Sequence, residues 1–309
     1  MPEPRLVSVI IPCYNQARFL PEAIESALAQ SYTRREVIVV DDGATDDTAQ
    51  VAARYYPSVR CVRQRNQGLS AARNTGLRAS TGDYVVFLDA DDRLLPGALE
   101  IGAACLDAHP LAAFTVGRHR RIAEDGTPLP TRRRPRVDSD HYVSLIRRCW
   151  IAMPATVMYR RARLVQAGAF DARKRCAEDY EVYLRLARSF PVIDHYAEVA
   201  EYRQHAGTLS RNAERMLVAT LDVLSRHRPG PDASAAHHAA YRARENAVWY
   251  YDRLLDTVVS SARCGQWREA ARALYVFARL LPRHRAYAAR RLTSPLRLAL
   301  RSLGRRAAA

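Results

Sequence analysis

Residues 6–92 alternate between short apolar runs and amphipathic stretches. Leu6–Ile11 and Glu36–Val40 are rich in β-branched residues and end at Pro12 and at Asp41-Asp42-Gly43, which is typical of buried strands. Between them, Gln16–Ser31 has apolar residues at helical spacing. The alternation continues with a helix expected over Thr45–Ala53, a strand over Val59–Arg63, a helix over Ser70–Ala79 and a strand over Tyr84–Leu88. This order predicts an α/β fold with a mostly parallel, Rossmann-like sheet flanked by helices.

The remainder of the chain has a different pattern. Short strands are expected at Ala113–Val116, Thr156–Tyr159 and Val192–Asp194, and the Pro- and Arg-rich segment 127–136 is expected to be a loop. Beyond Arg211 the spacing is helical, with breaks at Pro229–Pro231, Pro282 and Pro295. We therefore expect an α/β domain over residues 1–212 and a helical region over residues 213–309.

Charge is distributed unevenly between these two parts. The 309 residues carry a net charge of +16. Residues 215–309 hold 18 arginines and 6 acidic residues, a net of +12, which leaves +4 for the rest of the chain. Such a basic tail indicates attraction to an anionic surface, either phospholipid or nucleic acid.

Several classes of protein are disfavoured by composition. The six cysteines form no CxxC pair, so neither a zinc site nor a disulfide framework is indicated. With 48% hydrophobic and 26% charged residues the chain is expected to be globular. It has no run of 18 apolar residues and no signal-peptide pattern, so we expect a cytoplasmic protein without a membrane span.

Polar side chains follow three of the predicted strands. Tyr14-Asn15, Asp41-Asp42 and Asp89–Asp92 each come directly after an apolar run. In open α/β sheets, ligands bind at the carboxyl ends of the strands. Carboxylates such as Asp89 and Asp91 offer hard oxygen ligands for Mg²⁺ or Mn²⁺, although an isolated acidic cluster can also be a solvated turn. In Asn66–Gly76, Gly68 allows close backbone approach and Arg73 can reach a phosphate or base; the alternative is an ordinary capped helix.

Four segments together resemble a known family. PCYN (12–15), VDDGATDDT (40–48), NQGLSAARNTGL (66–77) and FLDADD (87–92) are similar, in order and spacing, to the inverting family 2 glycosyltransferases of the GT-A fold. The resemblance implies a nucleotide-sugar donor lying across the sheet edge. It assigns donor binding to Pro12, Tyr14, Asn15, Asp41 or Asp42, Arg73, Asp89 and Ala90. It also implies a divalent cation, Mn²⁺ or Mg²⁺, at Asp89 and Asp91.

Two later segments extend the resemblance. Glu178-Asp179 looks like the family's ED motif at the start of a helix, which implies that Asp179 is the general base; Glu178 is the alternative base or positions Asp179. An acidic pair at a helix N-terminus also favours the helix dipole and need do nothing else. The segment Tyr202–Ser210 resembles the family's closing segment, in which His205 returns to the cation.

The resemblance implies transfer of one sugar from a nucleotide-sugar donor, with a UDP-sugar as the first choice. It implies that the acceptor is a hydroxyl of a saccharide or lipid-linked molecule, in the assembly of a bacterial cell-surface glycan. Processive synthases of the family carry a QxxRW motif, which is absent. Ala271–Leu281 and Leu292–Leu303 mix arginine with apolar residues at helical spacing. Such helices either lie on the inner face of the plasma membrane or pack on their own protein.

Two other functions stay open at this point. A nucleotidyltransferase would need a metal and a nucleotide too, but Cys13–Gln16 stands where those proteins have a Gly-rich basic loop. A nucleic-acid-binding protein would use the Arg-rich tail. The acidic sheet edge would repel a polyanion, so we expect no nucleic-acid partner.

Overall fold

The computed structural model describes residues 3–131, 134, 136–137, 140–205, 207 and 212–284. These residues form two compact units, one of 3–145 with 150–207 and one of 146–149 with 212–284.

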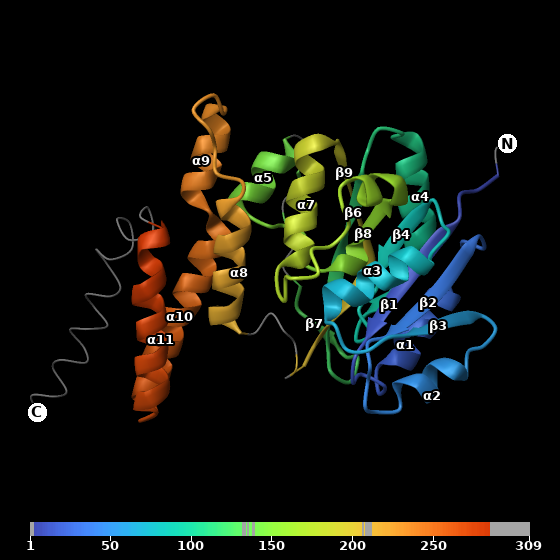
Figure 1. Cartoon of the computed structure of the whole chain (residues 1–309), viewed down its shortest axis with the longest axis horizontal. Coiled ribbons are helices and arrows are strands. Elements are labelled where there is room, and N and C mark those ends of the chain that lie inside the picture. Colours follow the sequence, from blue (N-terminus) through green and yellow to red (C-terminus); the bar gives the residue numbers. More distant parts are fainter. Residues whose placement is uncertain are drawn as a thin grey trace, which may run out of the picture. The chain divides into compact units, whose positions relative to one another are not determined.

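The first unit begins with the predicted parallel sheet. Its strands run in the order β3-β2-β1-β4, with β1 at Val7–Cys13, β2 at Arg35–Asp41, β3 at Val59–Arg63 and β4 at Tyr84–Phe87 (Figure 1). The connecting helices are α1 (Leu20–Leu28), α2 (Thr48–Ala53) and α3 (Leu69–Ala79). Cys13 on β1 pairs with Asp41 on β2, so these strands end side by side. The α/β prediction is confirmed.

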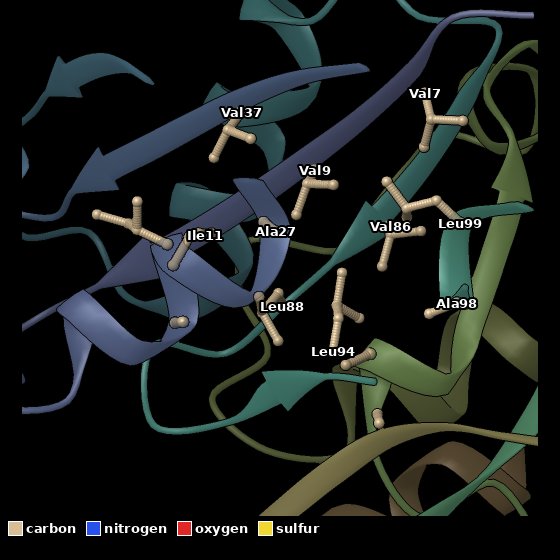
Figure 2. Packing of buried hydrophobic residues seen from close by; sticks show 14 of the residues in the cluster. Val7, Val9, Ile11, Ala27, Val37, Val86, Leu88, Leu94, Ala98 and Leu99 are labelled. Carbon is tan, nitrogen blue, oxygen red and sulfur yellow. The ribbon is translucent and has the colours of Figure 1, made fainter. Parts of the chain in front are cut away.

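Buried aliphatic side chains hold helices against this sheet. Every residue of β1 is buried, and Figure 2 shows Val9 and Ile11 of this strand beside Ala27 of α1. Helix α1 begins at Leu20, later than the predicted Gln16. The chain first makes a turn there, in which the carbonyl of Gln16 accepts the N–H of Phe19, and proline at the first turn then favours a helix start.

The second half of the sheet contains longer strands than the sequence predicted. It continues in the order β8-β6-β9-β5, with β8 at Val157–Arg160, β6 at Phe114–Ala123, β9 at Val192–Gln204 and β5 at Arg93–Leu94. Strand β7 (Pro128–Leu129) pairs with β6, inside a segment expected to be a loop. The outer halves of β6 and β9 are polar, and Arg118 of β6 pairs with Glu198 of β9 at 2.7 Å. Cross-strand ion pairs therefore replace the apolar run by which a strand is recognised.

Between β5 and β9 the chain forms four further helices and a short 3₁₀ turn at Pro154–Thr156. The helices are α4 (Ala98–Ala108), α5 (His141–Arg147), α6 (Arg161–Gln166) and α7 (Glu178–Ser189).

The second unit is helical, as predicted. It contains α8 (Ala213–Ser225), α9 (Ala235–Ala243), α10 (Glu245–Arg263), α11 (Trp267–Leu280) and a 3₁₀ turn at Leu281–His284. Its core joins Leu217 and Leu221 of α8 to Tyr251 of α10 and Phe277 of α11. None of the described helices combines the length and hydrophobicity needed to cross a bilayer. The predicted helix over Leu292–Leu303 and the break at Pro295 lie outside the described residues.

The contact between α3 and the sheet depends on Gly76. A Cβ at this position would lie 2.2 Å from Cγ2 of Ile10, a β-branched side chain fixed in the central strand. At Gly102 of α4 an added Cβ would meet the end of the flexible Met158 side chain, at 2.7 Å. We expect Gly76→Ala to lower the free energy of unfolding by about 2 kcal/mol through overpacking. Gly102→Ala should stay within about 1 kcal/mol of the parent, because Ala also favours the helix.

Urea unfolding followed by circular dichroism measures both variants. Equal effects of the two substitutions would contradict the packing that we describe for α3.

Candidate active site

The loops that follow β1 and β2 are joined at the carboxyl edge of the sheet. The N–H of Asp42 donates to the carbonyl of Cys13 at 2.9 Å, and the side-chain oxygen of Asn15 accepts the N–H of Thr45 at 2.8 Å. Asn15 has a left-handed backbone, with φ of 54°, which turns the chain directly after the strand. Tyr14 remains exposed beside it. The predicted polar residues therefore gather at one edge.

Asp41 and Asp42 differ in what they bind, a distinction that the sequence left open. The carboxylate of Asp42 accepts the backbone N–H groups of Gln67 and Gly68 at 2.9 and 2.8 Å, and the amide of Gln64 at 2.7 Å. Asp42 thus shapes the loop before α3. Oδ1 of Asp41 accepts the N–H of Ala44, whereas its buried Oδ2 lies 3.3 Å from Nε of Arg63 and has no hydrogen-bond donor within the described part of the chain. Oδ2 of Asp41 therefore has an ion-pair partner but an unused capacity to accept a hydrogen bond.

Arg73, on α3, is a fully buried arginine at this edge. One guanidinium nitrogen lies 2.8 Å from Asp89, directly after β4, and another lies 2.8 Å from Glu178 at the start of α7. Burial disfavours the cation, but the two carboxylates outweigh it, and the pKa of Arg73 rises above its usual value. The arginine expected at the nucleotide thus joins β4 to α7.

Asp179 follows Glu178 in the first turn of α7. Glu178 is buried against Arg73, whereas Asp179 is only half-buried, and its Oδ1 accepts the N–H of Tyr180 at 2.7 Å. Burial, assisted by the negative charge of Glu178, raises the pKa of Asp179 to about 7, against the opposing effect of Arg73. A carboxyl group of this kind can exchange a proton near neutral pH.

Asp91 and His205 form a direct pair, although they are far apart in the sequence. Nε2 of His205 lies 2.8 Å from Oδ2 of Asp91. Nδ1 of His205 accepts the N–H of Gly207 at 3.1 Å, so Nε2 carries the proton and donates it to Asp91. The ring also packs on Phe19, with the ring centroids 5.1 Å apart. The structure thus brings together two of the three residues predicted to hold a cation.

Asp89, the third predicted ligand, is tied to Arg73 instead. Within the described part of the chain, no group of three or more His, Cys, Asp or Glu side chains is placed to hold a metal ion. The pair of Asp91 and His205 still supplies a carboxylate oxygen and an imidazole nitrogen side by side, donor types that Mn²⁺ accepts. A cation held by both side chains would take the place of the proton that Nε2 of His205 donates to Asp91, and it would need further ligands such as substrate phosphate oxygens.

Arg203 at the end of β9 is a second buried arginine, which the sequence analysis missed. Its side chain donates to the carbonyls of Asp91 and Glu124 at 2.8 and 2.7 Å, and to the carboxylate of Glu22 at 2.7 Å. Its backbone N–H donates to Asp92 at 2.9 Å. The motif in Tyr202–Ser210 indicates a role for His205 but none for Arg203, two residues before it. Arg203 fixes the loop that carries Asp91.

The buried ion pairs of Arg73 make a prediction about stability. In Arg73→Met, both Asp89 and Glu178 lose their partner, and we expect the free energy of unfolding to fall by about 3–5 kcal/mol. Adding Glu178→Gln removes one of the two unpaired charges, so the double variant should recover part of the loss. Arg173→Met is the control, because Arg173 pairs with Asp171 while 87% exposed, so the variant should unfold at nearly the same denaturant concentration as the parent.

Chemical denaturation of the four proteins decides this point. If Arg73→Met and Arg173→Met were equally stable, the buried bridge would not contribute as described.

Comparisons with known proteins identify the family of the chain. The family model for Glycosyl transferase family 2 matches residues 8–166, more than half of the chain. An uncharacterized glycosyltransferase of Rickettsia felis is 31% identical over 204 residues, which cover 65% of this chain and 33% of the relative. The chain spans a third or less of the length of the first curated relatives that it matches.

Two solved structures share the fold. S. aureus TarS 1–349 in complex with UDP-GlcNAc aligns with a TM-score of 0.62 at 20% identity, over 88% of this chain and 80% of that one. Mannosyltransferase PcManGT from Pyrobaculum calidifontis, in complex with GDP-Man and Mn²⁺, aligns with a TM-score of 0.61 at 20% identity, over 94% and 88%. These likenesses confirm the predicted GT-A architecture. The family match favours a glycosyltransferase over the nucleotidyltransferase alternative. The chain belongs to glycosyl transferase family 2.

Proposed function

We propose that this glycosyltransferase inverts the anomeric centre while it moves one sugar residue from a nucleoside-diphosphate sugar to an acceptor hydroxyl. The observation that carries the proposal is the bridge through Arg73, which fixes Asp179 beside the Asp89–Asp92 loop. A proton acceptor is thereby held next to the predicted donor site. The acceptor is a saccharide or lipid-linked sugar of a bacterial cell-surface glycan; the Rickettsia relative is bacterial too.

The donor nucleotide lies across the ends of β1 and β2 in this proposal. Asp41 keeps a buried oxygen without a hydrogen bond, which suits an N–H group of a nucleobase. Tyr14 offers an exposed ring for stacking, and the backbone around Pro12 and Asn15 lines the same edge. Ala90, within the Asp89–Asp92 loop, has a buried side chain. TarS was solved with UDP-GlcNAc and PcManGT with GDP-Man, and we favour a UDP-sugar for this chain.

A divalent cation belongs to the same proposal. Asp91 and His205 would hold it, with Asp89 kept nearby by Arg73. When bound, the cation stabilises negative charge on the departing nucleoside diphosphate. PcManGT was solved with Mn²⁺, which supports this choice.

Asp179 takes the acceptor proton in the proposed reaction. As the hydroxyl oxygen attacks the anomeric carbon, its proton passes to the carboxylate, and the bond to the diphosphate breaks on the opposite face. Asp179 is the better candidate than Glu178, because Glu178 is buried and occupied by Arg73. Glu178 then acts as a positioning residue.

Binding of the donor nucleotide gives the first functional test. UDP with Mn²⁺ should stabilise the protein by about 2.7 kcal/mol at a hundredfold excess over the dissociation constant. Asp91→Asn should remove the part of this stabilisation that needs Mn²⁺. Asp83→Asn, at the opposite end of β4, is the control and should behave as the parent.

The measurement is thermal unfolding with UDP, GDP, dTDP and CMP, each with and without Mn²⁺ or Mg²⁺. A shift with GDP alone would transfer the donor assignment to guanosine, and no shift with any nucleotide would contradict the proposed site.

The pKa of Asp179 makes a prediction about pH dependence. A base must be deprotonated to accept a proton, so kcat/KM should fall as the pH drops through about 7. In Glu178→Gln the neighbouring negative charge is gone and Arg73 is less neutralised, so the acid limb should move to lower pH while turnover persists. Asp179→Asn should lower kcat at least about a hundredfold.

Rates of sugar transfer across a pH series test this assignment. If Glu178→Gln abolished transfer and Asp179→Asn did not, Glu178 would be the base.

A further inference from the structure

Helix α11 of the second unit has two apolar faces. Its inner face carries the side chains buried in the core of the unit, namely Ala270, Ala273, Val276, Phe277 and Leu280. Its outer face carries Trp267 and Tyr275, both 65% exposed, and Leu274, which is 44% exposed. Ala271 and Ala278, also exposed, continue the strip formed by these three residues at helical spacing. A helix that only packs on its own protein has a polar outer face instead.

Arginines border this α11 strip. Arg268, Arg272 and Arg279 are exposed on the same helix, where Glu269 is the one acidic residue. Arg279 lies over the ring of Tyr275, 5.8 Å from its centroid, and Arg272 lies 3.4 Å from Glu214. Within the described residues, Arg268 and Arg279 have no carboxylate partner. The sequence after α11 adds positive charge without any acid, at Arg283, Arg285, Arg290, Arg291, Arg297, Arg301, Arg305 and Arg306.

We propose that the α11 strip binds the surface of a membrane that contains anionic phospholipids. Tryptophan and tyrosine rings prefer the boundary between headgroups and acyl chains, and leucine and alanine bury their apolar surface there. The bordering arginines lie at the depth of the lipid phosphates, and the basic sequence that follows adds attraction to the same surface. The proposal goes beyond the sugar-transfer reaction and does not depend on it.

Charge and polarity favour lipid over the other candidate occupants. A nucleic acid would match the arginines but offer nothing to Trp267 and Leu274 on a regular helix face. A second copy of the chain, packed strip to strip about a two-fold axis, would bring Arg268 and Arg279 against an equally basic border. An anionic bilayer is the partner that accepts both the apolar strip and its border.

Vesicle flotation of the full-length chain tests the proposal. The protein should float with vesicles of phosphatidylcholine and phosphatidylglycerol, and much less with phosphatidylcholine alone. Trp267→Ser/Leu274→Ser/Tyr275→Ser should weaken partitioning at least about tenfold. The matched control is Tyr56→Ser/Leu111→Ser/Val165→Ser, which removes exposed apolar groups of the first unit and should float as the parent does.

A second pair of variants tests the border. Arg268→Glu/Arg272→Glu/Arg279→Glu should weaken partitioning about a hundredfold, since each arginine near the surface contributes about 1 kcal/mol. Arg54→Glu/Arg60→Glu/Arg78→Glu changes the net charge equally at exposed sites of the first unit, and it should lose much less. Circular dichroism and nucleotide-dependent thermal shifts of each variant show that the fold and donor site persist.

Three results would overturn the proposal. The parent protein could fail to float with anionic vesicles. The strip variant could float as well as the parent, which would transfer binding to the basic sequence beyond α11. Finally, the strip variant could lose an oligomer seen by light scattering while flotation is unchanged, which would identify the strip as a contact between copies.

Discussion

The ion pairs of Arg73 hold together the carboxyl edge of the sheet in the first unit. A buried guanidinium is stable only when carboxylates compensate for its lost hydration, and Asp89 and Glu178 do so at 2.8 Å each. The two carboxylates come from the end of β4 and the start of α7, segments about ninety residues apart in the chain. Removal of Arg73 leaves both Asp89 and Glu178 without this partner. The sheet edge and the helix that carries Asp179 are therefore obliged to stay together.

This bridge also sets the protonation of the site. The positive charge of Arg73 opposes a rise in the pKa of Asp179 but does not prevent it. Burial and the negative charge of Glu178 then raise the pKa of Asp179. Arg203 plays a similar role for the acidic loop. It binds Glu22 and the backbone carbonyl of Asp91, while the carboxylate of Asp91 pairs with His205. Two buried arginines thus bind Asp89, Glu178 and Glu22, while Asp91 and Asp179 are not among their ion-pair partners in the described part of the chain.

The sequence predicted the parts of the fold that depend on local pattern. The parallel strands and their helices follow from the alternation of buried runs and polar turns, and the edge residues follow from where those runs end. Strands β6 and β9 were underestimated because Arg118 and Glu198 satisfy each other across the sheet, which no local hydrophobicity reveals. Contacts between residues far apart in the sequence also determine what the local pattern left open at the site. Backbone N–H groups of Gln67 and Gly68 bind Asp42 but not the second carboxylate oxygen of Asp41. Two distant carboxylates likewise bind Arg73.

Helix α11 is a second element whose environment the sequence pattern does not determine. Its sequence has apolar residues nearly all around, so the pattern alone is compatible with a buried helix or with one that lies on a membrane. The structure separates the two sets, because Val276 and Phe277 fill the core while Trp267 and Leu274 do not. The charges divide in the same way. Arginines of the first unit, such as Arg73 and Arg203, form ion pairs with carboxylates. Within the described part of the chain, Arg268 and Arg279 form no such pair, although both are exposed beside the apolar α11 strip. A partner that offers both negative charge and hydrocarbon would match this combination.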